Sequence, residues 1–298
     1  MDEFRIPIGE VADTVITWIV NNLNALFSVL RTIFDEMYGA IFAILDGPGW
    51  IVITILAALI ALLSRGWKFM LGTIIGLVVI VGVDQWENAM SSLSLVLVAT
   101  FWALVISIPL GIWAAKSDTF SALIRPVLDF LQTMPAFVYL IPALLLFRVG
   151  VAPGIVATII FAMAPGVRFT ELGIRSVDAE VVEAGQAFGS SPSRILRQIQ
   201  LPLALPTIMA GVNQVIMLSL SMVVIAGMVG AGGLGGDVIK SLNRLDTALG
   251  VEAGLAVVII AMILDRLTNA FGKHSGLFAK FRARKPHVDS VPQDSMNA

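Results

Sequence analysis

The sequence predicts an all-α membrane protein that crosses the bilayer about seven times and begins with an amphipathic helix. Hydrophobic residues make up 57% of the 298 residues and charged residues only 13%, a composition far from that of an average soluble domain. The hydrophobic residues fall into blocks of about the length that a helix needs to cross the hydrocarbon core, roughly 17 residues or more. Most of the charged residues lie between these blocks.

The first 49 residues are expected to form a separate N-terminal region. Apolar and polar residues alternate over residues 8–45 at a spacing of three or four, which is the period of a helix with one apolar face. Such a helix either lies in the membrane interface, with Trp18 and Phe27 as anchors, or packs on the outside of the helical bundle. The sequence DGPG at residues 46–49 then breaks the helix.

Seven apolar blocks follow, at residues 50–64, 69–83, 90–115, 130–147, 152–170, 204–229 and 249–264. The first two are short and form a hairpin around residues 65–68, so residues 50–84 are assigned to the first two transmembrane helices. Residues 85–272 form the main core, and residues 273–298 a basic tail. The fourth block contains Pro135 and Pro142, which predicts a kinked helix buried in the bundle.

The distribution of Lys and Arg predicts the orientation. These residues concentrate in the loops at residues 65–68, 116–125 and 175–197 and in the tail, which places those segments in the cytoplasm by the positive-inside rule. The N-terminus is then outside and the C-terminus cytoplasmic. The tail either contacts anionic lipid or forms a solvated end.

Composition argues against several classes of function. The formal net charge is -2 and no long basic run occurs outside the tail, so we expect no nucleic-acid partner. The absence of cysteine removes disulfides and thiol catalysis. His274 and His287 have no other ligand residues at a useful spacing, so we expect no metal site.

One polar stretch, residues 178–202 (DAEVVEAGQAFGSSPSRILRQIQLP), interrupts the apolar blocks. Asp178 is suited to cap a first helix, and Gly189 to end it in the left-handed conformation. Ser191 is then suited to cap a second helix that begins with a proline, and Leu201 and Pro202 are expected to close it. The stretch therefore predicts two short helices joined by a turn, on the cytoplasmic side.

The spacing within this stretch resembles a known signature. Glu183, Ala184 and Gly185 are followed after three residues by Gly189, and after nine more by Ile199-x-Leu201-Pro202. This pattern is similar to the EAA motif of ATP-binding cassette (ABC) importer permeases, with Gly185 where a second alanine is usual. The flanking sequences, LPLALPTIMAGVNQVIMLSLSMVVIAGMVGAGGLG and ILDRLTNAFGK, resemble the permeases of glycine betaine and proline betaine importers over roughly residues 85–272.

The resemblance implies a type I ABC importer permease core in which residues 178–202 are coupling helices that sit in a cleft of a separate ABC ATPase. The residues implied to couple are Glu183, Ala184, Gly185, Ala187, Phe188, Gly189, Ile199, Leu201 and Pro202. Ala187, Phe188, Ile195 and Ile199 are expected to offer an apolar face to the ATPase. The other interpretation is an amphipathic cytoplasmic loop in which Glu183 is simply solvated.

The resemblance also implies partners. These are the ATPase, a periplasmic or lipid-anchored substrate-binding protein, a second copy of the chain and the lipids of a bacterial inner membrane. No Walker A sequence occurs in the chain, so ATP and Mg are expected to bind the partner ATPase, and this chain is expected to hold no cofactor and to be a transport subunit rather than an enzyme.

The implied solute is a quaternary-ammonium compatible solute such as glycine betaine, proline betaine or choline, and no residue of the substrate pathway is assigned. Alternatives are a permease for another small solute such as an amino acid, an ion-coupled carrier or channel, and an intramembrane enzyme. The centres of the blocks are almost free of charge, which argues against the carrier. Neither a His-Glu-x-x-His nor a Gly-x-Ser-x-Gly pattern supports the enzyme.

Two further patterns leave alternatives open. The glycine-rich sequence at residues 227–236 serves either close packing and a turn or a flexible outer gate. Arg168, Glu171 and Arg175 are spaced for ion pairs along one helix, which predicts a local ion network, with a role in transport as the second interpretation.

Overall fold

The computed structural model describes residues 7–272, and this part of the chain is helical without any strand. The elements are α1 (Ile8–Asp46), α2 (Trp50–Arg65), α3 (Trp67–Gly82), α4 (Trp86–Lys116), α5 (Asp118–Thr133), α6 (Ala136–Phe147), α7 (Val151–Arg175), α8 (Ala179–Ala187), α9 (Pro192–Ile195), the π-helical turn η2 (Leu196–Gln200), α10 (Leu201–Gly227), α11 (Gly233–Arg244) and α12 (Thr247–Gly272). The predicted all-α architecture is confirmed, and the predicted tail lies outside the described residues.

Four helices in this part of the chain are long and apolar enough to cross a membrane: α4, α7, the continuous helix Pro192–Gly227, and α12. Two bent pairs, α1 with α2 and α5 with α6, raise the number to as many as six. The expected number of seven counted α2 and α3 separately, and each has only 16 residues. Since roughly 17 residues are needed to cross, that number stays a prediction.

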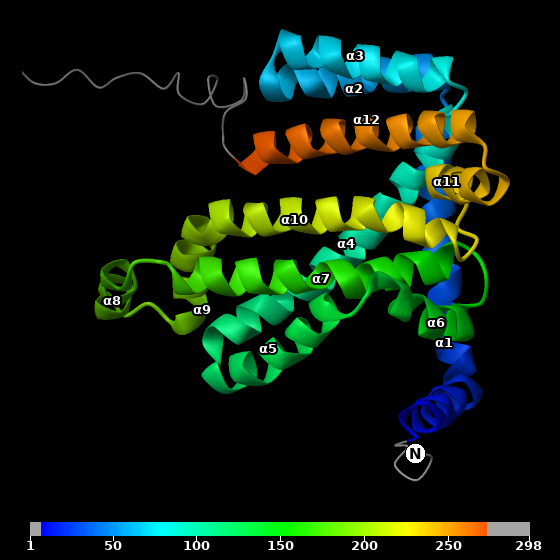
Figure 1. The fold of residues 1–298 in the computed structure, drawn as a ribbon. Coiled ribbons are helices and arrows are strands. Elements are labelled where there is room, and N and C mark those ends of the chain that lie inside the picture. Colours follow the sequence, from blue (N-terminus) through cyan, green and yellow to red (C-terminus); the bar gives the residue numbers. More distant parts are fainter. Residues whose placement is uncertain (1–6, 273–298) are drawn as a thin grey trace, which may run out of the picture.

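Helix α1 lies across the ends of the long helices, at the end of the molecule that also holds α6 and α11 (Figure 1). Its second half packs on the bundle, because Phe34 is buried and the ring of Phe27 meets that of Phe147 edge-on at 5.3 Å. Tyr38 Oη also lies 2.8 Å from Ser91 Oγ of α4. The packing interpretation is therefore confirmed for this half. The first half, before the kink at Leu23, extends past α6 with exposed apolar side chains.

Helix α7 lies at the centre of the bundle, between α4 and α10. Close approach requires small residues here: a Cβ on Gly111 of α4 would lie 2.7 Å from the carbonyl oxygen of Val167. Likewise, a Cβ on Gly166 of α7 would overlap the side chain of Ser107. Small residues at such positions let helix backbones approach each other within a membrane, so these three helices form the rigid centre to which the other elements attach.

The fourth apolar block comprises the end of α5 and all of α6, and the predicted kink is a sharp break between two helices; a single span there stays a prediction. Helices α5 and α6 meet at an angle of 98° at Met134 and Pro135. The residue before a proline avoids the helical region, and Met134 is extended with ψ 135°. The hydroxyl of Tyr139 donates to the carbonyl oxygen of Leu131 at the break, which satisfies a group that the missing helical turn leaves free.

The glycine-rich sequence at the end of α10 leads into α11, a helix that was not expected from the apolar blocks. A Cβ on Gly235 would lie 2.1 Å from the carbonyl oxygen of Val223, and one on Gly227 would lie 2.3 Å from Gly235. Close packing and a turn are therefore confirmed for these glycines. The buried carboxylate of Asp237 fixes α11 further, because it accepts hydrogen bonds from Gln85 and Asn88, and Lys240 pairs with it at 2.8 Å.

Candidate functional site

The polar stretch forms a projection at the end of the molecule opposite to α1 and α11, with α8 standing clear of the bundle (Figure 1). Local signals set the limits of α8 as predicted, whereas Ser191 precedes α9 without a side-chain cap hydrogen bond. The carboxylate of Asp178 accepts a hydrogen bond from the Glu180 N–H at 2.9 Å at the start of α8. At its end Gly189 is left-handed with φ +74°, and the Ser190 N–H donates to the Gly185 carbonyl oxygen at 3.1 Å, a common way to end a helix.

Helix α8 rests on α9 and η2 through small and branched apolar residues. A Cβ on Gly185 would lie 2.8 Å from Ile199 Cδ1 and 3.6 Å from Ile195 Cγ1. Ile195 is buried and Ile199 half-buried. The expectation of an apolar face toward a partner is therefore wrong for Ile195 and stays a prediction for the half-exposed Ile199. They join the two arms of the projection to each other.

The second helix does not close at Leu201 and Pro202, which corrects another prediction. The chain stays helical from Pro192 to Gly227. Pro202 lacks an N–H and its ring would clash with the preceding turn of an α-helix. The π-helical turn removes this conflict by widening the helix, and the Leu201 N–H donates to the Leu196 carbonyl oxygen five residues earlier. The projection therefore continues directly into α10.

Four of the nine expected coupling residues form the free outer surface of α8. Glu183, Ala184, Ala187 and Phe188 are all exposed, and the Phe188 side chain is 90% exposed. Glu183 forms no ion pair within residues 7–272. Gly189 lies in the turn, Gly185 and Ile199 lie at the internal contact, and Leu201 and Pro202 begin α10. A bulky aromatic side chain in water beside small residues is typical of a surface that a partner covers.

A buried carboxylate lies at the base of the projection. Glu171, near the end of α7, has a side chain only 7% exposed, and its Oε1 accepts from Ser121 Oγ at 2.6 Å and from Arg125 Nη2 at 3.0 Å. Arg175 also pairs with this oxygen at 3.0 Å. The predicted network along α7 is thus confirmed for Glu171 and Arg175. Arg168, in contrast, pairs with Asp129 of α5 on the exposed side.

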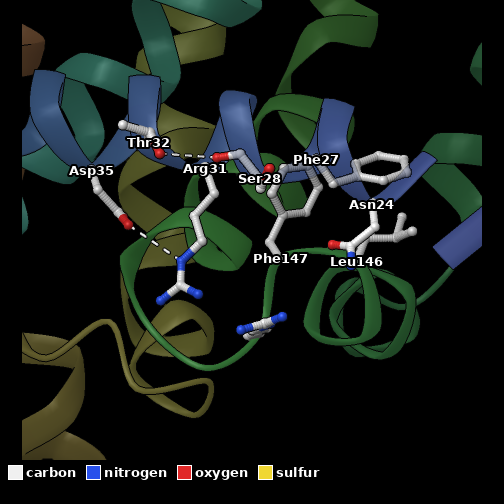
Figure 2. Close-up of a pocket in the computed structure, with 9 residues that line it drawn as sticks. Asn24, Phe27, Ser28, Arg31, Thr32, Asp35, Leu146 and Phe147 are labelled. Atoms are coloured by element: carbon white, nitrogen blue, oxygen red, sulfur yellow. Dashed lines mark hydrogen bonds and ion pairs between the residues drawn. The ribbon is translucent and has the colours of Figure 1, made fainter. Parts of the chain in front are cut away.

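Sequence reasoning missed the α5 partners Asp118, Ser121, Arg125 and Asp129, because spacing along one helix gives no information about a neighbouring helix. It also missed a polar cavity of about 300 Å³ between α1 and the end of α6. Figure 2 shows Arg31 and Asp35 pointing toward each other in this cavity, where Arg31 Nε lies 3.4 Å from Asp35 Oδ2. The cavity lies at the α1 end, far from the projection.

Residues 107–275 match the family of binding-protein-dependent transport system inner membrane components. The chain is 46% identical over 270 residues, 91% of its length and 76% of the relative's, to the glycine betaine/proline betaine transport system permease protein ProW of Escherichia coli (strain K12). It is 44% identical, over 89% of its length and 94% of the relative's, to the glycine betaine transport system permease protein OpuAB of Bacillus subtilis (strain 168).

Solved structures show the same fold at lower identity. The MetNI methionine ABC transporter in inward-facing conformations matches with a TM-score of 0.59 and 18% identity, over 63% of this chain and 94% of that chain. An amino acid ABC transporter with histidines matches with a TM-score of 0.51 and 20% identity. The family match and the relatives that cover about nine-tenths of the chain show that it belongs to the binding-protein-dependent transport system inner membrane components, the permease subunits of ABC importers.

Proposed function

We propose that this permease carries quaternary-ammonium compatible solutes, of the glycine betaine, proline betaine or choline class, across a bacterial inner membrane. Relatives named for glycine betaine and proline betaine match about nine-tenths of the chain at 44% to 46% identity. The structures named for methionine and for an amino acid share less than a quarter of their residues with it and support the fold alone. Uptake of radiolabelled glycine betaine by cells that carry the whole importer tests the solute, and uptake of an amino acid in place of betaine would contradict it.

The projection is the proposed site where an ABC ATPase drives this subunit. The observation that carries this proposal is the free surface of α8, where Phe188 is 90% exposed beside Glu183, Ala184 and Ala187. Gly185, Ile195 and Ile199 pack the two arms of the projection against each other. The projection can therefore move as one rigid unit and transmit a displacement to the helices that it joins. ATP and Mg bind the ATPase in this proposal, since the chain has no Walker A sequence.

Two copies of the chain are proposed to enclose the pathway around a two-fold axis, each presenting one projection to one ATPase. Exposed apolar side chains lie along α5 and α6 and are available for such a contact between copies. They are Leu123, Val127, Phe130, Phe137 and Ile141. The projection then faces the cytoplasm with the C-terminus, while the N-terminus and the α1 end face a periplasmic or lipid-anchored binding protein. Arg194 and Arg197 of the projection fit this orientation.

The test of coupling is the substitution Phe188→Ala in the co-expressed importer. We expect the affinity for the ATPase to fall by about tenfold or more, as for a central aromatic residue of an interface, and uptake to fall with it. Leu242→Ala is the matched control, because Leu242 is also an exposed apolar residue but lies on α11 at the opposite end. Unchanged binding of the ATPase to the Phe188→Ala permease would sink the coupling proposal.

A further inference from the structure

The carboxylate of Glu171 joins two helices, α5 and α7, at the base of the projection. Ser121 and Arg125 of α5 donate to its Oε1 at 2.6 and 3.0 Å, and Arg175 Nε of α7 forms an ion pair with the same oxygen at 3.0 Å. The Glu171 side chain is 7% exposed, so its carboxylate is shielded from water and is surrounded by these partners instead. Bonds from charged donors to a carboxylate are roughly twice as strong as neutral ones, which makes this a firm connection between α5 and α7.

Arg175 extends this connection to α4 and to the projection. Its Nη2 donates to the Ala114 carbonyl oxygen near the end of α4 at 2.8 Å, and its Nη1 pairs with Asp118 Oδ1 at the start of α5 at 2.7 Å. Arg175 is the last residue of α7, three positions before Asp178, which caps α8. A displacement of α8 therefore reaches Arg175 first, and Arg175 is tied to the ends of two other helices.

Helix α5 leads from this point toward the opposite end of the molecule. It runs to the break at Met134 and continues as α6, whose last residue, Phe147, packs against Phe27 and Phe34 of α1. Apart from Glu171 and its partners, α5 is held to α7 by Leu128, buried with Ala164 and Val167, and by the exposed pair of Asp129 and Arg168. The contacts of Glu171 add to these a connection between the start of α5 and the end of α7.

We propose that Glu171 is a positioning residue for transport, which makes α5 and α6 move with α7 when the ATPase displaces α8. This inference rests on the proposed coupling role of the projection. A buried ion pair adds little net stability, since the cost of removing the charges from water offsets their attraction. It does impose one geometry on its partners, and transmission of a movement between helices requires such a connection.

The test uses the complete importer, with its ATPase and binding protein, in proteoliposomes that are supplied with radiolabelled glycine betaine. The quantity measured is the number of solute molecules taken up per ATP hydrolysed. For Glu171→Gln, which keeps the shape and removes the charge, we expect this ratio to fall by about fivefold or more, the lower range of a coupling between sites. ATP hydrolysis stimulated by the binding protein is expected to stay within about twofold, because α8 still docks.

Asp129→Asn is the matched control, since Asp129 of α5 pairs with Arg168 of α7 on the exposed side of the same two helices. Its ratio is expected to equal that of the unmodified importer. The double variant Glu171→Ser with Ser121→Glu moves the carboxylate from α7 to α5 across the same contact, and it is expected to restore at least about half of the ratio. A purely structural role predicts no loss of the ratio in Glu171→Gln and no such rescue.

A Glu171→Gln importer with an unchanged ratio, or one whose uptake and ATP hydrolysis fall in equal proportion, overturns the inference. If that variant does not assemble, Arg125→Gln decides instead, because the Arg125 side chain is 62% exposed and its loss leaves the core intact. An unchanged ratio in Arg125→Gln then overturns it. The Phe188→Ala experiment separates the two proposals, since failure of docking there tests the projection without touching Glu171.

Discussion

Gly185 of α8 and Ile199 of η2 meet so closely that a Cβ on the glycine would lie 2.8 Å from Ile199 Cδ1. This contact decides how far α8 stands from the helix that leads into α10. The neighbouring atom is the end of a flexible side chain, so a small added group can be accommodated by a change of rotamer, and a large one cannot.

Gly185→Ala is therefore expected to leave assembly with the ATPase unchanged, since the clash with Ile199 is offset by about 0.5 to 1 kcal/mol of helix propensity gained over glycine. Gly185→Leu is expected to tilt α8 and weaken ATPase binding by about tenfold, or 1.4 kcal/mol. The measurement is co-purification at graded ATPase concentration. The double variant Gly185→Leu with Ile199→Ala makes room for the new side chain and should recover binding; a double variant that is no better than Gly185→Leu contradicts this account.

Gly189 is constrained by its backbone and not by its surroundings. Its φ is +74°, and a Cβ there would meet no atom within 4 Å. Gly189→Ala is expected to destabilise the turn by about 1 to 2 kcal/mol, the cost of the left-handed conformation for a residue with a Cβ. Gly189→Asn should cost less, because asparagine tolerates this conformation. Thermal unfolding of the purified permease gives the comparison.

The control for Gly189 is Gly39→Ala in α1. A Cβ on Gly39 also meets no atom within 4 Å, but its φ is that of an ordinary helix. This control is expected to gain about 0.5 to 1 kcal/mol. Equal effects of the two alanines would show that the left-handed turn does not govern the end of α8.

Asp237 holds α11 to α4, and its loss should release that helix. Asp237→Ala leaves the side-chain amides of Gln85 and Asn88 without their buried acceptor, at a cost of about 1 to 3 kcal/mol. The chain has no cysteine, so a single Ser241→Cys substitution reports directly on this region through its rate of thiol labelling. Ser241 is buried, and we expect faster labelling in the Asp237→Ala background.

Lys240→Ala is the control for Asp237. The Lys240 side chain is 59% exposed, and it pairs with Asp237 from the surface. An exposed ion pair contributes roughly 0 to 1 kcal/mol, so the labelling rate at position 241 should change little. A large increase with Lys240→Ala would mean that the ion pair, and not the buried hydrogen bonds, anchors α11.

The limits of α8 could be predicted from the sequence because they depend on neighbours in the chain. Asp178 caps the helix through an N–H two residues away, and Gly189 ends it through its own φ. The helices α4, α7, α10 and α12 could be predicted equally well from their apolar blocks, since a long apolar run has few alternatives to a helix within a membrane.

Tertiary contacts explain the predictions that were wrong or missing. The side chains of Ile195 and Ile199 point toward α8 because of where α8 folds back on the second arm. The helix continues past Pro202 through a π-helical turn, which no sequence motif indicates. The Glu171 partners Ser121 and Arg125 lie 50 and 46 residues away in sequence.

The unbroken helix from Pro192 to Gly227 makes the projection one end of a long rod. Its 36 residues, at 1.5 Å each, span about 54 Å. A tilt of about 5° about its first residue would displace its far end by about 5 Å. That end is Gly227, whose backbone touches Gly235 of α11 so closely that a methyl group does not fit between them. A backbone contact that cannot accept even a methyl group therefore lies at the point that a small rotation of the other end would displace most.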